Sequence, residues 1–240
     1  MTRISPAHRL GAGRRQALWR GLLAVFAAWL ALNALPVQAR YDPDMLRERL
    51  AARFDPSRTA LLDEWLAMIA SAGALEERAK LMRVNDFING SLAFEDDISV
   101  WEQSDYWATP LEMIGKGRGD CEDFAIIKYV SLRMMGVASR KLRLVYAKAR
   151  LEGQAGPVWM AHMVLAYYAA SGAEPLVLDN LDGAILPASQ RSDLQPVFSF
   201  NSGGIFAGVS GKGAVKAASG IGRLSRWEDA WRRILADGYE

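Results

Sequence analysis

The stretch GKGRGDCEDFAIIKY, residues 115–129, decides how the rest of the chain is interpreted. Gly117 and Gly119 interrupt regular structure, and apolar residues recur at helical spacing after Cys121, so a mostly buried helix is expected to begin there. The only cysteine of the chain is therefore expected at a helix start, among three carboxylates: Asp120, Glu122 and Asp123. Because the thiolate is the nucleophile, this negative charge opposes reactivity unless a cation neutralises it.

The residues before this stretch predict helices. Apolar residues recur every three or four positions in residues 44–54, 58–72 and 75–89, and the last of these ends at the stop signal Asn89-Gly90. Residues 94–114 are rich in aromatic and acidic residues without a clear period, which predicts a loop with short turns. The amino-terminal third of the folded chain is therefore expected to be helical.

The residues after the cysteine helix predict a sheet. Three β-rich segments follow, separated by Gly or Ser turns, and a fourth lies closer to the carboxyl terminus: residues 141–149, 161–169, 175–181 and 197–201. The short connections leave no room for crossover helices, so the strands are expected to be antiparallel. The fold class predicted is α+β, with the cysteine helix packed on the sheet.

The first 39 residues predict a secretory signal peptide. Five arginines precede or adjoin the apolar run GLLAVFAAWLALNAL, and small residues before position 40 are typical of a cleavage site. A single membrane anchor is the alternative, but the run is shorter than the roughly 20 residues that a span needs. The predicted organisation is a signal peptide at 1–39, a folded domain at 40–201 and a glycine-rich tail at 202–240 ending in a helix at 223–237. The protein is thus expected to be exported, without a stable membrane span after cleavage.

The charge balance changes when this leader is removed. The whole chain carries 29 basic and 27 acidic residues, and loss of the five leader arginines leaves 24 against 27, a net charge of −3. Net charge therefore does not favour nucleic-acid binding. A lone cysteine in an exported protein cannot form an intramolecular disulfide, and its acidic neighbours make a poor apolar packing site, which favours a functional thiol.

Three residue types suited to nucleophilic catalysis follow one another along the chain. Of the two histidines, His8 falls in the leader, which leaves His162 on a predicted strand. A solitary strand histidine is often a core residue, but Asp179 follows 17 residues later and would lie about one diagonal step from His162 if residues 171–172 form the turn. Cys121, His162 and Asp179 would then supply nucleophile, base and orienting group.

The carboxylates around Cys121 also suggest a metal site. Ca²⁺ takes about six to eight oxygen ligands, and further acids lie upstream at Asp96, Asp97 and Asp105. The alternative is that Asp120 caps the helix, while Glu122 and Asp123 merely suit the positive end of its dipole.

Five segments together resemble a known family: GKGRGDCEDFAIIKY, DYWATPLEMIG, AHMVLAYY, EPLVLDNL and PVFSFN. They are similar to the periplasmic bacterial transglutaminase-like cysteine proteinases of the LapG type, over about residues 44–201. The resemblance implies a papain-like or transglutaminase-like fold with Cys121, His162 and Asp179 as the catalytic triad. It also implies calcium dependence, with Asp120 and Glu122 matching the calcium ligands and Asp123 carried over less directly.

The same resemblance implies a substrate and a regulator. The substrate would be a large surface adhesin, cut near its amino terminus at a pair of alanines to release biofilm cells. An inner-membrane receptor that senses cyclic di-GMP would inhibit the proteinase by binding it. Two other functions remain open on the residues alone: a transglutaminase-type acyl transferase with the same catalytic residues, and a non-catalytic calcium-binding interaction module.

Overall fold

A computed structural model describes residues 41–153, 156–207 and 221–239. The chain divides into two compact units, Met1–Val37 and Gln38–Glu240, and all the described residues belong to the second. The predicted signal peptide lies outside the described residues. Within the described ranges, no helix is both long and apolar enough to cross a membrane.

Helices form the first half of the described chain and return at its end. They are α2 (Pro43–Arg53), α3 (Thr59–Ala72), α4 (Glu77–Ser91), α5 (Asp97–Trp101), α6 (Pro110–Lys116), α7 (Cys121–Met134) and α8 (Ile221–Asp237). The predicted helices at 44–54, 58–72 and 75–89 are confirmed as α2, α3 and α4. The last continues through the expected Asn89-Gly90 stop and ends at Ser91.

The expectation of a simple loop over residues 94–114 is wrong. Helices α5 and α6 form there, and strands β1 (Ala93–Phe94) and β2 (Arg118–Gly119) pair in parallel on either side of them. Helices of five and seven residues are too short to show a period, so end signals carry the information. Helix α6 has such a signal, because Pro110 is its first residue and Thr109 and Glu112 form a capping box.

The second half of the domain is an antiparallel sheet, as predicted. Its strands are β3 (Leu142–Gly153), β4 (Gly156–Tyr167), β5 (Leu176–Leu178), β6 (Leu186–Pro187), β7 (Leu194–Asn201) and β8 (Gly204–Ala207). They lie in the order β6-β5-β4-β3-β7-β8, with antiparallel neighbours throughout. Strands β3 and β4 extend further than expected and form a long hairpin. The α+β class is therefore confirmed.

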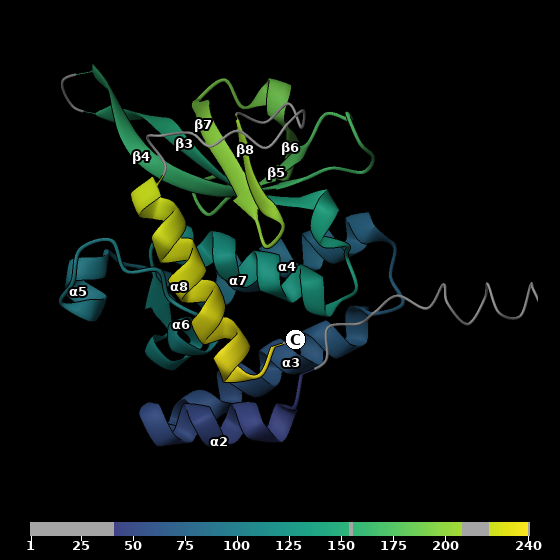
Figure 1. Cartoon of the computed structure of the whole chain (residues 1–240), viewed down its shortest axis with the longest axis vertical. Coiled ribbons are helices and arrows are strands. Elements are labelled where there is room, and N and C mark those ends of the chain that lie inside the picture. Colours follow the sequence, from purple (N-terminus) through teal and green to yellow (C-terminus); the bar gives the residue numbers. More distant parts are fainter. Residues whose placement is uncertain (1–40, 154–155, 208–220, 240) are drawn as a thin grey trace, which may run out of the picture. The chain divides into compact units, whose positions relative to one another are not determined.

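Helix α7 runs below the sheet and packs against both strand β4 and helix α4, and this position fixes the cysteine (Figure 1). The predicted stripe of Phe124, Ile127, Val130 and Met134 is buried, but so are the other faces of the helix along nearly its whole length. A helix that is buried all round is held by contacts on every side. Cys121, at its first turn, is thereby placed at the edge of the core.

Helix α8 is part of the same core, although residues 202–240 were expected to form a tail separate from the folded domain. The Trp227 side chain is 3% exposed, and its ring centroid lies 5.8 Å from Tyr129 of α7 and 5.6 Å from Phe200 of β7. Asp237 accepts hydrogen bonds from Arg53 and Thr109, at 2.7 and 2.8 Å. Residues 208–220, most of the glycine-rich segment, lie outside the described ranges.

Candidate active site

The start of helix α7 is built by hydrogen bonds around Asp123. Its buried carboxylate accepts the main-chain N–H of Ala108 at 2.7 Å and that of Asp120 at 3.3 Å. A Cβ atom at Gly119 would lie 2.5 Å from Asp123 Oδ2, so only glycine fits there without a shift. These contacts hold Cys121 at the first helical position, as the sequence predicted.

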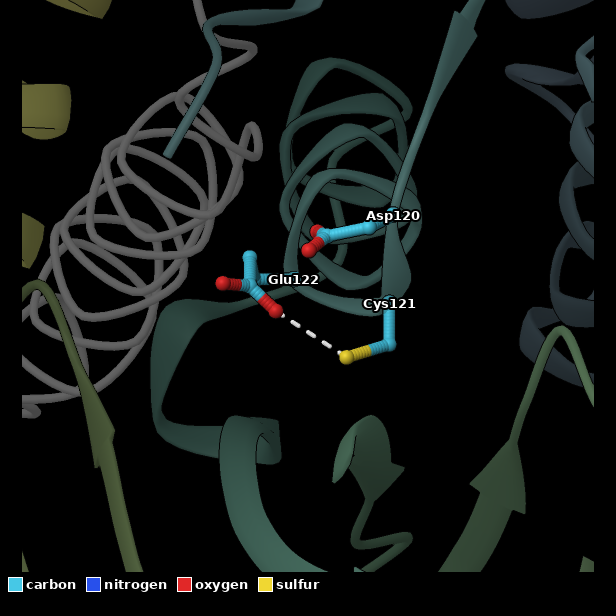
Figure 2. A group of neighbouring side chains, drawn as sticks. All are labelled: Asp120, Cys121 and Glu122. Atoms are coloured by element: carbon cyan, nitrogen blue, oxygen red, sulfur yellow. Dashed lines mark hydrogen bonds between the residues drawn. The ribbon is translucent and has the colours of Figure 1, made fainter. Parts of the chain in front are cut away.

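Cys121 lies in a site that opposes ionisation of its thiol. Its Sγ donates to Glu122 Oε2 at 3.0 Å, and Asp120 directs its carboxylate toward the same space (Figure 2). Burial raises the pKa of the thiol, and the charges of Glu122 and Asp120 raise it further. The main-chain N–H of Met163 acts in the other direction, because it donates to the sulfur and favours the thiolate.

The structure brings His162 and Asp179 together. His162 lies on β4, and Asp179 follows β5, which pairs with β4 so that Leu165 lies opposite Leu178. This register puts Asp179 one diagonal step from His162, and the His162 Nε2 atom is 2.8 Å from Asp179 Oδ1. The intervening turn includes Gly172, whose φ of +79° is one that glycine adopts without strain.

Asp179 is held in its ionised form by partners that the sequence did not indicate. Arg191 donates to its Oδ2 at 2.6 Å, and the Leu181 main-chain N–H donates to its Oδ1 at 3.0 Å. Burial by itself would raise the pKa of Asp179, but hydrogen bonds and charge from His162, Leu181 and Arg191 outweigh it and lower the pKa to about 2. The carboxylate therefore stays charged beside the imidazole.

The main-chain carbonyl of Asp179 is fixed as well. Its oxygen accepts from Asn89 Nδ2 of α4 at 2.8 Å and from Lys128 Nζ of α7 at 2.9 Å. Lys128 is fully buried. Burial lowers its pKa to about 7, although the nearby Asp179 charge opposes that shift. Two helices thus anchor the strand end that carries Asp179.

Cys121 and His162 line one cavity of about 300 Å³. Tyr146 and Met163 from the sheet form one wall of it, and the acidic residues Asp97, Asp120 and Glu122 line it as well. The site therefore combines a thiol at a helix start, an imidazole paired with an ionised carboxylate, and a group of acids beside the thiol.

These acids fit a divalent cation better than they fit helix capping alone. Oxygen atoms of Asp97, Asp120 and Asp123 lie within 4.8 Å of one another, and Asp120 and Glu122 form a second such group with Cys121. Within the described residues, the buried Oδ1 atoms of Asp97 and Asp120 have no hydrogen-bond partner. Burial and mutual repulsion raise the pKa of Asp97 to about 6 and that of Asp120 to about 10. Hard oxygen ligands crowded in this way are what Ca²⁺ binds.

Of the three upstream acids, the structure places Asp97 in this cluster and gives the other two separate contacts. Asp96 caps helix α5 by accepting the Ser99 N–H at 3.0 Å. Asp105 accepts from Trp107 Nε1 at 3.0 Å and pairs with Arg226 at 3.2 Å.

The mixed fold places a thiol at the start of a central helix and an imidazole–carboxylate pair on the adjoining sheet. This combination is typical of the papain-like and transglutaminase-like cysteine proteinases. The chain belongs to the bacterial transglutaminase-like cysteine proteinase family, whose model matches residues 68–193.

Solved structures of LapG from Legionella pneumophila are similar to the chain. One is 33% identical and superposes with a TM-score of 0.65, covering 82% of this chain and 99% of that one. The EGTA-treated form gives 33% identity, a TM-score of 0.66 and the same coverage. The calcium-bound form gives 33% identity and a TM-score of 0.63, covering 80% of this chain and 99% of that one. No curated protein matches the chain.

Proposed function

We propose that this proteinase is a calcium-dependent endopeptidase in which Cys121 is the nucleophile, His162 the base and Asp179 the group that orients the base. The observation that carries the proposal is the 2.8 Å contact between His162 Nε2 and Asp179 Oδ1, in a site where His162 shares a cavity with Cys121. In such a triad, the base must lie within reach of the nucleophile and must itself be held by the orienting group.

The tautomer of His162 follows from its partner. A carboxylate only accepts hydrogen bonds, so the neutral ring carries its proton on Nε2 and leaves Nδ1 as the basic nitrogen. Nδ1 takes the proton of the Cys121 thiol, and the sulfur attacks the substrate carbonyl carbon. When the peptide bond breaks, Nδ1 returns the proton to the leaving amine. Water then attacks the thioester and releases the acid and the free thiol.

The surroundings of the sulfur supply part of the stabilisation. The N–H of Met163 donates to Sγ and favours the thiolate. The main-chain N–H groups in the first turn of α7 are suited to hold the oxyanion of the tetrahedral intermediate, because a helix start carries partial positive charge.

The acid cluster is the proposed calcium site, with Asp97, Asp120, Glu122 and Asp123 as its candidate ligands. A bound Ca²⁺ would supply positive charge that offsets the carboxylates next to the thiol. Asp97 and Asp120 offer oxygens without other partners in the described structure, and Glu122 would exchange its bond to the thiol for a ligand role. The calcium-bound form of LapG supports calcium binding by this family member, and the choice of ligands rests on the grouping of the acids in this chain.

The substrate, location and regulator are proposed from the family resemblance. The enzyme would act in the periplasm on the amino-terminal region of a large surface adhesin, cut at a pair of alanines, and release biofilm cells. An inner-membrane cyclic di-GMP receptor would hold it inactive. The 33% identity to LapG over 82% of the chain supports a shared substrate class.

The test uses the full chain, exported with its leader and purified from the periplasm. It is incubated with a folded adhesin fragment that contains a pair of alanines, with Ca²⁺ or with EGTA, and the products are weighed by mass spectrometry. Cleavage that needs Ca²⁺ and falls at least about a thousandfold in Cys121→Ala is expected. Products cross-linked to or modified by an added amine would instead identify an acyl transferase. Full biological activity of Cys121→Ala would identify a binding module.

The calcium assignment has a matched pair of variants. Asp97→Asn removes a charge from the cluster, whereas Asp96→Asn changes the neighbouring exposed residue and keeps its capping role. We expect the Ca²⁺ concentration for half-maximal cleavage to rise at least about tenfold in Asp97→Asn and to stay near wild type in Asp96→Asn. Equal calcium responses of the two variants would show that Asp97 is not a calcium ligand.

A further inference from the structure

A second cavity lies away from the proposed active site. It has a volume of about 870 Å³ and is lined by the turn after β4, the residues before β3 and parts of the β7–β8 hairpin. It shares no lining residue with the cavity that contains Cys121. The proposed proteolysis therefore does not account for it.

Arg143 is the charged side chain buried in this second cavity. It lies on β3 and is 9% exposed. Its guanidinium carbon is 4.8 Å from the centre of the Tyr168 ring and 4.0 Å from that of Phe206. Aromatic rings at these distances stabilise the cation but accept no ordinary hydrogen bond from it. Within the described residues, Nε and Nη1 of Arg143 have no hydrogen-bond partner.

The chain offers Arg143 little counter-charge. Among the described residues it forms no ion pair within 4 Å. Glu174 lines the cavity as an exposed, charged carboxylate that accepts the Ser189 N–H at 2.8 Å, but it forms no ion pair with Arg143.

A buried cation with unused donors is costly unless an anion pairs with it. Arginine is suited to this role, because its planar fork matches the oxygens of a carboxylate or a phosphate. The rest of the wall is mostly apolar or aromatic, with Ala169, Ala170 and Ala173 beside the two rings. Exposed Arg140 adds positive charge at the same cavity, whereas Lys141 is paired with Glu77 at 2.7 Å.

We propose that this cavity binds a small organic anion. Its carboxylate or phosphate group pairs with Arg143, and its apolar body lies against Tyr168 and Phe206. This site is separate from the cysteine and from the acid cluster, so binding requires neither Ca²⁺ nor a free Cys121 thiol. The inference holds whether or not the proposed endopeptidase activity is correct.

The test measures binding of two simple probes, benzoate and phenyl phosphate, to the full chain with Cys121→Ala in EGTA. Each probe is titrated by calorimetry and by thermal unfolding, against sodium chloride at equal ionic strength. At least one probe is expected to bind saturably and raise the melting temperature. The tighter of the two identifies the anionic group that the site prefers.

Two variants and one control assign the binding to this cavity. Arg143→Gln removes the anchor, and Ala173→Trp fills the cavity without changing charge. Each is expected to weaken the tighter probe at least tenfold. Arg150→Gln changes an exposed arginine on the same strand and should leave affinity within twofold of wild type. If Arg143→Gln does not fold, Ala173→Trp decides the question. Absence of saturable binding of both probes, or wild-type affinity in a folded Arg143→Gln or Ala173→Trp protein, overturns the proposal.

Discussion

Replacing Lys128 by methionine should make the protein more stable and less active. Lys128 is fully buried, and burial lowers its pKa from 10.5 to about 7. Each pH unit of that difference corresponds to about 1.4 kcal/mol, so carrying the charge inside the fold costs about 5 kcal/mol below pH 7. Methionine has a similar length and fills the same space. It loses a hydrogen bond to the Asp179 carbonyl worth about 2 kcal/mol, which leaves a net gain of about 3 kcal/mol.

The pH dependence of this effect has a definite sign. Below pH 7 both the folded and the unfolded chain hold the lysine proton, and the folded chain bears the full cost. Between the folded pKa of about 7 and the usual 10.5, the unfolded chain binds one proton more, so wild-type stability rises with pH by about 1.4 kcal/mol per unit. The Lys128→Met protein lacks this contribution. Its advantage should shrink by about 2 kcal/mol between about pH 7.5 and 9.

Urea denaturation of both proteins across this pH range measures the difference directly. Lys148→Met is the control, because it removes an exposed lysine of β3 and should show no pH-dependent difference from wild type. Cleavage by Lys128→Met is expected to fall about tenfold, because Asn89 alone then holds the Asp179 carbonyl and small displacements at a catalytic group are costly. A less stable Lys128→Met protein at pH 6, or a stability gap that does not change with pH, contradicts this account of the buried amine.

Two further predictions test the support of the site. Arg191→Met should lower the free energy of unfolding by about 3 kcal/mol, because it leaves buried Asp179 without its cation. The pKa of Asp179 should rise with it, so the acid limb of the kcat/KM profile should move to higher pH; an unchanged limb would show that Arg191 does not set the charge of the pair. Trp227→Ala should cost about 3 kcal/mol in urea denaturation, whereas Leu235→Ala on the exposed face of α8 should cost under about 1 kcal/mol. Similar losses in both would mean that α8 is not part of the cooperative core.

The helices, the antiparallel sheet and the meeting of His162 with Asp179 could be predicted because each rests on local order. Periodic apolar positions mark the long helices, and short connections force neighbouring strands to run antiparallel. The alternation of side chains then brings residues 17 apart on a hairpin to one diagonal. Helices α5 and α6 could not be predicted in this way, because they are too short to show a period of apolar residues.

The groups that hold Asp179 could not be predicted, because nothing local marks their contacts. Arg191 lies 12 residues from Asp179, Lys128 lies 51 away and Asn89 lies 90 away. Only the packing of α4 and α7 against the sheet brings them together. The place of Trp227 in the core could not be predicted for the same reason, because a glycine-rich segment separates this residue in sequence from the sheet that it covers.

The two halves of the site differ in where their charge comes from. On the histidine side, Arg191 and main-chain donors keep Asp179 ionised with a pKa of about 2, so the orienting carboxylate is ready in the fold itself. On the cysteine side, the pKa of Asp120 rises to about 10, and its Oδ1 has no partner in the described structure. Environments that push two carboxylates apart in this way assign them different tasks. In the proposed mechanism, Asp179 is therefore ready to orient His162 without any added ion, whereas a cation bound by the acids beside Cys121 would favour ionisation of the thiol.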